Sequence, residues 1–288
     1  MINITISKNK LWNKYTENNL NLWLRGDIYS HKIERIIEIC QNIKEDDISS
    51  FLKTIEGHFA LVVQKNDISF IAVDKIRSIP LFFIKIKNDF FIDCDPKNLV
   101  NLNDFDKSID NNAILEIAMS GFTIGNKTIY KNLLTLKAGE IVFFKDNKYK
   151  YSNYFKYYGE IDNKNFEDYK KELSKITLSI FRKILSRIGD RQIVIPLSAG
   201  NDSRLVASVL KHLGAKNVKC YSYGTEGNFE AKIAKIISNK LGYEWKFIPL
   251  THKSERKFYA SDEFKLYLDY SETFCSVHIS KAYQQLNI

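Results

Sequence analysis

The chain has 288 residues, enough for two domains, and its 44% hydrophobic and 13% aromatic residues exclude wholesale disorder. No apolar run approaches the ~20 residues of a membrane span, and the first residues lack the basic and apolar regions of a signal peptide, so we expect a cytoplasmic protein that does not associate with membranes. The net charge is +9, but the lysines are scattered beside Asn, Asp and Glu, which is typical of solvated surfaces, so a nucleic-acid partner is not expected. A general attraction to anionic ligands is equally consistent with the charge.

Three hairpin patterns occupy much of the first half of the chain. In each, two runs of apolar and β-branched residues flank a short polar turn. The first covers residues 57–74 with its turn at 64–67. The second covers 79–95, and the third covers 136–152 with Asp146 and Asn147 at its tip.

Two helical patterns accompany these hairpins. Residues 31–43 form an apolar helix face from Ile33, Ile36, Ile37 and Cys40. Residues 110–121 begin with Asp110 as a capping residue and end at Gly121. Hairpins with a few helices predict an α+β domain built in layers, which we assign to residues 1–158.

The second half of the chain changes its period. Residues 165–189 predict a long amphipathic helix, ended by Gly189, with apolar residues at spacings of three and four: Phe166, Tyr169, Leu173, Ile176, Ile180 and Ile184. Strands then alternate with helices, at 192–197, about 203–213, 217–223, 229–241 and 244–249. This alternation predicts an α/β domain with a parallel sheet, assigned to residues 165–288, after a polar boundary at 158–164. The tail at 257–286 is interpreted as helices.

The cysteines are far apart in the sequence and form no CxxC pair. Reduced, buried thiols are therefore a better interpretation than a metal site or a disulfide framework. The four are Cys40, Cys94, Cys220 and Cys275.

The sequence Ser-Ala-Gly-Asn-Asp-Ser at 198–203 follows the first strand of the parallel sheet. Ligands of open α/β sheets lie beyond the carboxyl ends of the strands, and the amides that open a helix attract anions. Ser198 offers a hydroxyl, and Ala199 and Gly200 would let a ligand approach the main chain. Neither a Walker A loop nor GxGxxG is present. The alternative is structural: Asp202 or Ser203 caps the next helix, and Gly200 only makes the turn.

This turn resembles the pyrophosphate loop, SGGxDS, of the N-type ATP pyrophosphatases, with Ala199 in place of the first Gly. The continuation resembles the synthetase domain of asparagine synthetases, at Tyr221-Ser222-Tyr223-Gly224, Phe229-Glu230-Ala231 and Leu241-Gly242. The resemblance implies an adenine nucleotide alpha hydrolase-like fold. It also implies that ATP activates a small-molecule carboxylate as an acyl-adenylate, and that ammonia or another amine then displaces AMP.

The resemblance also implies a set of ligand residues. ATP and its pyrophosphate would be bound by Ser198, Ala199, Gly200, Asp202 and Ser203, and Asp202 would help to hold Mg²⁺. Pro196 and Tyr223 would border the adenine, although a strand end and an ordinary core aromatic are open alternatives for these two. No catalytic side chain is indicated.

Residues 21–155 resemble the class II glutamine amidotransferases and imply an NTN-hydrolase-like fold. Five segments follow the order of that family: Gly26-Asp27-Ile28-Tyr29 (NGEIYN), Gly57 to Leu61 (GxFA), Asp74 to Phe83 (DRxGxxPLYY), Ile92 to Leu99 (FASExKAL) and Ala138-Gly139-Glu140 (Pro-Gly before the last hairpin). In that family the nucleophile is an N-terminal Cys. This chain begins Met1-Ile2 and has Arg25 where the family has Asn, so we do not expect glutamine hydrolysis.

The C-terminal part of the family pattern is also missing. The family completes its site with a later Gly-rich loop carrying an Asp-Glu pair, whereas Asp262-Glu263 of this chain is interpreted as a solvated helix start. The expectation is a domain that is incomplete at its C-terminus, as a fragment or an inactive member.

Other functions stay open at this point. A tRNA-modifying enzyme with a pyrophosphate loop would suit the basic charge, and a non-catalytic or truncated nucleotide-binding relative would suit the missing C-terminal residues. The acceptor carboxylate, the amine and the oligomeric state, with a homodimer as one alternative, are also open.

Overall fold

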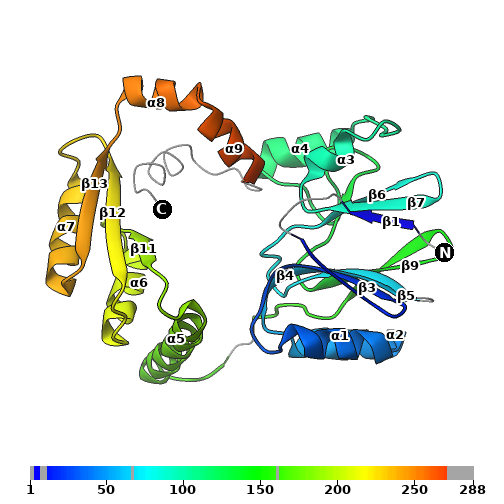
Figure 1. Ribbon diagram of the computed structural model, residues 1–288, viewed down its shortest axis with the longest axis horizontal. Helices are drawn as coiled ribbons and strands as arrows, with labels where there is room; N and C mark the ends of the chain where they lie inside the picture. Colours follow the sequence, from blue (N-terminus) through cyan, green and yellow to red (C-terminus); the bar gives the residue numbers. More distant parts are fainter. Residues whose placement is uncertain (1–2, 7–11, 66–67, 160–161, 271–288) are drawn as a thin grey trace. The chain divides into compact units, whose positions relative to one another are not determined.

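The computed structural model describes residues 3–6, 12–65, 68–159 and 162–270. It divides the chain into two compact units, Met1–Gly159 and Glu160–Ile288 (Figure 1). The first hairpin's turn residues 66–67, part of the boundary stretch, and the tail beyond residue 270 with Cys275 lie outside the described residues.

The first unit contains a six-stranded antiparallel sheet in the order β10-β9-β5-β4-β3-β2. Its strands are β2 (Asn13–Glu17), β3 (Leu20–Ile28), β4 (Gly57–Lys65), β5 (Ile68–Val73), β9 (Glu140–Lys145) and β10 (Lys148–Asn153). The strand pairs β4–β5 and β9–β10 are two of the predicted hairpins. At the tip of the latter, Asp146 and Asn147 have φ values of 48° and 61°, a left-handed conformation that short polar residues tolerate.

A second, four-stranded sheet has the order β1-β7-β6-β8. Its strands are β1 (Asn3–Ile6), β6 (Phe82–Ile86), β7 (Asp89–Asp93) and β8 (Leu134–Thr135). The strand pair β6–β7 is the remaining predicted hairpin, and β1 pairs with β7 in parallel. Figure 1 shows this sheet on one face of the larger sheet and helices α1 (Ile33–Asn42) and α2 (Glu45–Thr54) on the other.

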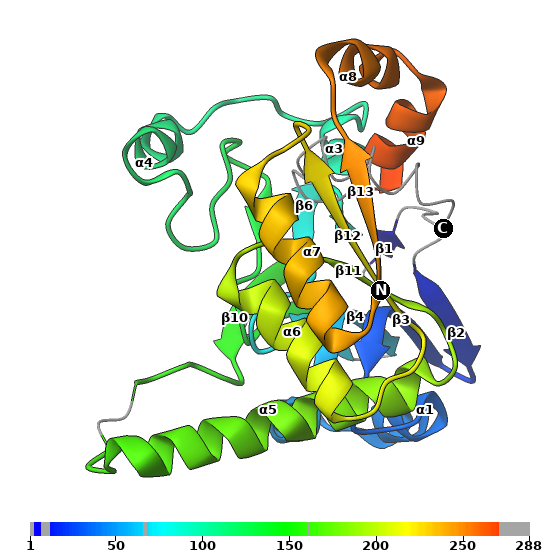
Figure 2. The ribbon, with the colours of Figure 1, turned by 90° about the vertical axis from the view of Figure 1, so that its left-hand side faces the viewer.

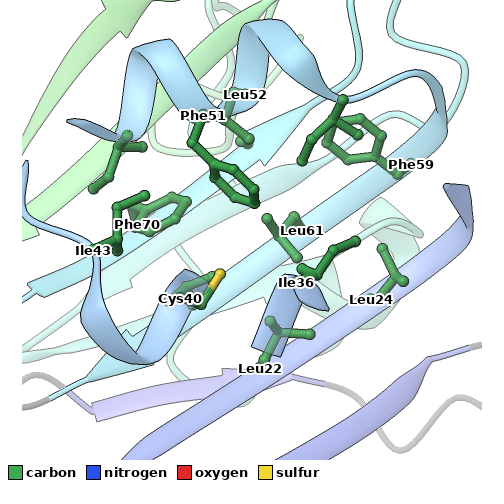
Figure 3. Packing of buried hydrophobic residues seen from close by; sticks show 14 of the residues in the cluster. Leu22, Leu24, Ile36, Cys40, Ile43, Phe51, Leu52, Phe59, Leu61 and Phe70 are labelled. Carbon is green, nitrogen blue, oxygen red and sulfur yellow. The ribbon is translucent and has the colours of Figure 1, made fainter. Parts of the chain in front are cut away.

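The central strands β4 and β5 are buried on both faces because they lie between these two layers. Alternate residues point to opposite sides of a strand. Accordingly Leu61 and Phe70 pack toward the helices, where they meet Ile36, Cys40 and Leu52 (Figure 3). Their neighbours Val62 and Ile71 pack toward the second sheet, against Phe83 and Phe90. This arrangement confirms the layered α+β prediction for the first unit.

Two further helices belong to the first unit, α3 (Pro96–Val100) and α4 (Asn111–Ser120). The predicted ends of α4 are confirmed. Asp110 Oδ1 accepts hydrogen bonds from the amides of Asn112 (2.9 Å) and Ala113 (3.2 Å), and Gly121 closes the helix with φ 83°. The sequence did not predict α2 or α3.

The second unit begins with α5 (Phe166–Ile188) and continues with β11 (Ile193–Pro196), α6 (Asn201–His212), β12 (Val218–Gly224), α7 (Phe229–Leu241) and β13 (Glu244–Pro249). The three strands form a parallel sheet in the order β11-β12-β13, so the predicted α/β unit is confirmed. Helices α6 and α7 lie side by side (Figure 2) and share one apolar cluster with Ile195, Cys220 and Phe181. Two helices follow, α8 (His252–Tyr259) and α9 (Asp262–Tyr270).

The long helix α5 packs through a narrow part of its surface. Only partly buried residues such as Phe181 and Leu185 reach the cluster of the second unit. The six apolar residues at spacings of three and four, Phe166, Tyr169, Leu173, Ile176, Ile180 and Ile184, are all exposed. Among the helices that the structure describes, none has both the length and the apolar composition needed to cross a bilayer.

Candidate functional site

The turn at 197–200 lies at the carboxyl edge of the parallel sheet. Leu197 extends β11 by one residue: its amide donates to Tyr221 O (2.8 Å), and its carbonyl accepts from Ser222 Oγ (2.6 Å). The polypeptide then turns away from the sheet, and α6 begins at Asn201. The turn is therefore the first strand-to-helix connection of the unit, at the edge where ligands of parallel sheets bind.

Two serines hold this turn closed. The Ser198 amide donates to Ser203 Oγ at 3.1 Å, and the two hydroxyl oxygens lie 3.1 Å apart. Ser198 Oγ also accepts from the Gly200 amide at 3.1 Å. In addition, Arg204 Nη2 donates to the Ala199 carbonyl at 2.7 Å. These contacts tie the turn at 198–200 to the first turn of α6.

Helix α6 starts without a capping side chain. Its N-cap residue is Gly200, with φ −67° and ψ 162°, so no capping side chain accepts from the first amides in the part of the chain that the structure describes. In contrast, α5, α7 and α8 are capped by Asn165, Asn228 and Thr251. The first amides of a helix have no intrahelical acceptor, and they carry the positive end of the helix dipole. An uncapped start is therefore open to an anionic ligand.

The alternative that this turn is only structural, with Asp202 or Ser203 as the helix cap, is wrong in one respect. Neither Asp202 nor Ser203 occupies the cap position, because α6 begins two residues earlier than the predicted start at about 203. Ser203 instead accepts from Ser198, and Asp202 is exposed in the first turn of the helix. Gly200 is the residue that makes the turn, and there a side chain would first meet Ser198 Oγ.

The two residues expected beside the adenine lie on strand ends of the same edge. Pro196 is exposed at the end of β11, where its Cα pairs with Tyr221. Tyr223 is half-buried near the end of β12 and stacks on Tyr221 with ring centroids 6.3 Å apart. By strand alternation Pro196, Tyr221 and Tyr223 point to one face, opposite to the face packed by α6 and α7. They therefore lie at the carboxyl edge that carries the turn, on the face away from α6 and α7, and their contact with an adenine stays a prediction.

The turn after β11 offers one carboxylate, that of Asp202, as a ligand for Mg²⁺. Within the described ranges, no three His, Cys, Asp or Glu side chains come together in a way that could hold a metal. Mg²⁺ keeps several waters and is commonly bound by one or two carboxylates together with substrate phosphates. The exposed Asp202 fits that mode, in which the ion arrives with a nucleotide, and does not fit a resident metal centre.

Gly26 lies in β3, where this strand comes very close to the main chain of β4. Gly26 has φ 88°, and a Cβ there would lie 2.1 Å from His58 O, so no other residue fits. The Tyr29 hydroxyl hydrogen-bonds His58 Nδ1, and the two rings meet edge to face with centroids 5.5 Å apart. Sequence reasoning singled out this segment only by its resemblance and did not anticipate the Tyr29–His58 pair.

The described thiols are not placed as nucleophiles. Cys40 is fully buried between the larger sheet and the helices, and burial raises the pKa of its thiol to about 12 (Figure 3). Cys94 and Cys220 are also buried, and burial raises the pKa of Cys220. Free, buried cysteines at these three positions confirm the interpretation made from the spacing.

Comparison with known proteins identifies the first unit more closely than the second. Residues 34–155 match a family model described as a glutamine amidotransferase domain, so this part of the chain is glutamine amidotransferase-like. No curated protein matches the chain.

Three of the solved structures that match are similar to this chain at low sequence identity. An NH3-dependent NAD synthetase from Campylobacter jejuni is 21% identical over 32% of this chain and 41% of its own, with a TM-score of 0.28. Glutamine phosphoribosylpyrophosphate amidotransferase from B. subtilis, complexed with ADP and GMP, is 12% identical over 81% of this chain and 72% of its own, with a TM-score of 0.30. A structure described as the allosteric regulatory enzyme of purine biosynthesis shows the same identity, share of this chain and TM-score over 61% of its own length. The chain thus spans less than two thirds of the first and third of these proteins.

Proposed function

We propose that this chain is an ATP-dependent, amide-forming ligase of the asparagine synthetase kind. The observation that carries the proposal is the turn after β11, where small residues and an uncapped helix start coincide at the ligand edge of a parallel sheet. In the proposed reaction a carboxylate oxygen of the substrate attacks the α-phosphorus of ATP, and the bond to the β-phosphate breaks. Pyrophosphate leaves. An amine nitrogen then attacks the acyl carbon, AMP leaves, and the nitrogen loses its proton to solvent.

The residues of the turn would act by binding and orienting the phosphates. The amides at the start of α6 would donate to the β- and γ-phosphate oxygens, and Ser198 and Ser203 would hold those amides in place. Magnesium would neutralise phosphate charge beside Asp202. Because backbone donors are fixed before the ligand arrives, their stabilisation of the leaving pyrophosphate requires little reorganisation.

Free ammonia or another amine fits the chain better than glutamine as the nitrogen source. Glutamine hydrolysis in class II amidotransferases requires an accessible thiolate. The described cysteines are buried, and the Cys40 thiol keeps its proton far above neutral pH. The amidotransferase-like unit would then act as a structural partner of the ligase unit.

The test begins with nucleotide binding, measured by calorimetry on the full chain with α,β-methylene-ATP and Mg²⁺. Gly200→Val places a branched side chain over the turn while keeping a φ that valine adopts readily, and we expect it to weaken binding at least about tenfold. Asp202→Asn should lower the affinity in Mg²⁺ and leave the weaker affinity in EDTA unchanged. Asp190→Asn, an exposed acid of the same unit, is the matched control and should bind as wild type does.

Product analysis then distinguishes the chemistry. With a panel of small carboxylates and ammonium, AMP and pyrophosphate should appear together in equal amounts. ADP and phosphate would contradict the proposal. Nucleotide binding without turnover of any carboxylate would favour a non-catalytic relative, and salt-sensitive binding of tRNA would favour the tRNA-modifying alternative.

A further inference from the structure

The first unit contains a cavity of about 810 Å³ that the proposed function does not use. It lies among β6, α3, the end of α4 and the segment from Gly121 to Thr135. Most of its lining is apolar and comes from side chains distant in sequence: Phe82, Val100, Ile117, Phe122, Ile129 and Leu133. A cavity of this size accommodates a drug-sized organic molecule.

Arg77 lines this cavity in a strained backbone conformation. Its φ is 57°, a left-handed value that costs a non-glycine residue free energy. In the DRxGxxP pattern that residues 74–80 resemble, the corresponding position is Gly. Arg77 Nη2 donates to Thr135 Oγ1 at 2.8 Å, and its buried Nε has no hydrogen-bond partner among the described residues. Strain of this kind persists where the surroundings fix it, and it concentrates at ligand sites.

The cavity wall carries cationic side chains beside the neutral donors Asn101 and Tyr130. The threonine hydroxyls at its wall are used internally: Thr123 Oγ1 donates to Lys127 O (2.8 Å), Thr128 Oγ1 to Leu133 O (2.9 Å) and Thr135 Oγ1 to Leu81 O (3.0 Å). Lys127 is paired with Glu116. Lys97 is exposed at the wall, and no acid pairs with it in the part of the chain that the structure describes.

We propose that this cavity binds an organic monoanion with an aromatic or aliphatic body, such as an aryl or medium-chain carboxylate. The apolar wall would bury the body, and Arg77 and Lys97 would hold the anionic group by charge-assisted hydrogen bonds. Arg77 and Lys97 supply two positive charges, and the buried Glu140, which pairs with Lys137 at 3.4 Å, also interacts electrostatically with Arg77. This balance suits a single negative charge better than a polyphosphate. The site is independent of the turn after β11.

The experiment compares two fluorescent probes of similar shape that differ in charge, 8-anilinonaphthalene-1-sulfonate and neutral N-phenyl-1-naphthylamine. We expect the anionic probe to bind the full chain at one main site and octanoate to displace it. Arg77→Gly and Lys97→Gln should each weaken the anionic probe about five- to tenfold and leave the neutral probe within twofold, because they remove a positive charge while the apolar side chains of the wall remain.

Arg77→Gly also checks folding, because glycine relieves the left-handed strain and should not lower the melting temperature. Lys107→Gln, an exposed lysine of the same unit outside the cavity, should change neither probe. Ile176→Lys removes an apolar side chain from the exposed face of α5 and should also leave both probes unchanged. If both probes bind Arg77→Gly and Lys97→Gln as tightly as wild type, or if Ile176→Lys abolishes binding, the proposed site is wrong.

Discussion

Ser198 and Ser203 tie the two ends of the turn after β11 together, through an amide-to-hydroxyl hydrogen bond and a hydroxyl pair, both at 3.1 Å. Ser203→Ala removes both contacts. We expect it to destabilise the second unit by about 1 kcal/mol, the typical net value of such hydrogen bonds. It should also weaken α,β-methylene-ATP binding about tenfold, since the amides of the turn lose their fixed positions.

Calorimetry measures the affinity, and urea unfolding followed by Trp245 fluorescence in a Trp12→Phe, Trp23→Phe background measures the stability of the second unit. Ser208→Ala, further along α6, is the control and should alter neither. A Ser203→Ala variant that keeps full affinity would show that the shape of the turn is unimportant for the nucleotide.

Asp74 is a buried polar support of the first unit. It is buried, and its carboxylate accepts from the amides of Phe59 (3.1 Å), Ile76 (3.0 Å) and Ser78 (3.0 Å). Asp74→Asn keeps the shape but replaces one acceptor oxygen by a donor, so amides on that side lose their partner. We expect a loss of about 2–4 kcal/mol in the free energy of unfolding.

The measurement is urea unfolding followed by Trp12 and Trp23 in a Trp245→Phe background, which reports on the first unit. The control is Asp104→Asn, which breaks only an exposed pair with Lys87 and should cost less than about 0.5 kcal/mol. Equal effects of the two substitutions would mean that the buried carboxylate is not a structural support.

The sequence predicted what local patterns encode. The hairpin around Asp146, the capped helix after Asp110 and the alternation of strands and helices beyond 190 are confirmed, because turn residues, caps and hydrophobic periods act over a few residues. Helix α2 was missed. Its first turn is acidic, and it has only three buried residues, Ile48, Phe51 and Leu52. Three apolar residues are too few to show a clear helical period.

Features that depend on tertiary packing could not be predicted from local sequence patterns. The Tyr29–His58 pair joins the residue directly after β3 to a residue of β4. The cavity at Arg77 is formed by segments between residues 77 and 135 that no short-range signal connects. The uncapped start of α6 was also hidden, because Asp202 and Ser203 are good capping residues at positions where the backbone does not use them.

Helix α5 shows that an apolar stripe in the sequence does not by itself identify the buried face of a helix. Its period is helical, but Leu173 and Ile176 are exposed, while Phe181 and Leu185 reach the apolar cluster. Leu173→Glu and Ile176→Glu should therefore change the free energy of unfolding by less than about 0.5 kcal/mol. Phe181→Ala should cost about 1–3 kcal/mol, less than a fully buried ring would. Trp245 fluorescence during urea unfolding measures both, and a large loss from either Glu variant would show that the stripe is a packing face.

The stability of the first unit should fall with rising pH above about 9 because of Cys40. Burial raises the pKa of its thiol from 9.0 to about 12. In the unfolded chain the thiol loses its proton near pH 9, whereas the folded protein retains it, so the native state binds more protons between these values. The stabilisation is complete below pH 9 and declines by up to about 1.4 kcal/mol per pH unit between 9 and 12.

Cys40→Ala removes this titration. The variant should be less stable at pH 8, since a buried sulfur is lost, but its stability should decline less steeply from pH 9 to 11. Urea unfolding at several pH values, again followed by Trp12 and Trp23 in the Trp245→Phe background, gives both slopes. Cys220→Ala is the control because it lies in the second unit and should not alter the first unit's slope. If Cys40→Ala and wild type lose stability in parallel from pH 9 to 11, burial does not keep the Cys40 thiol protonated in the folded protein. Its exclusion as a glutaminase nucleophile would then need another explanation.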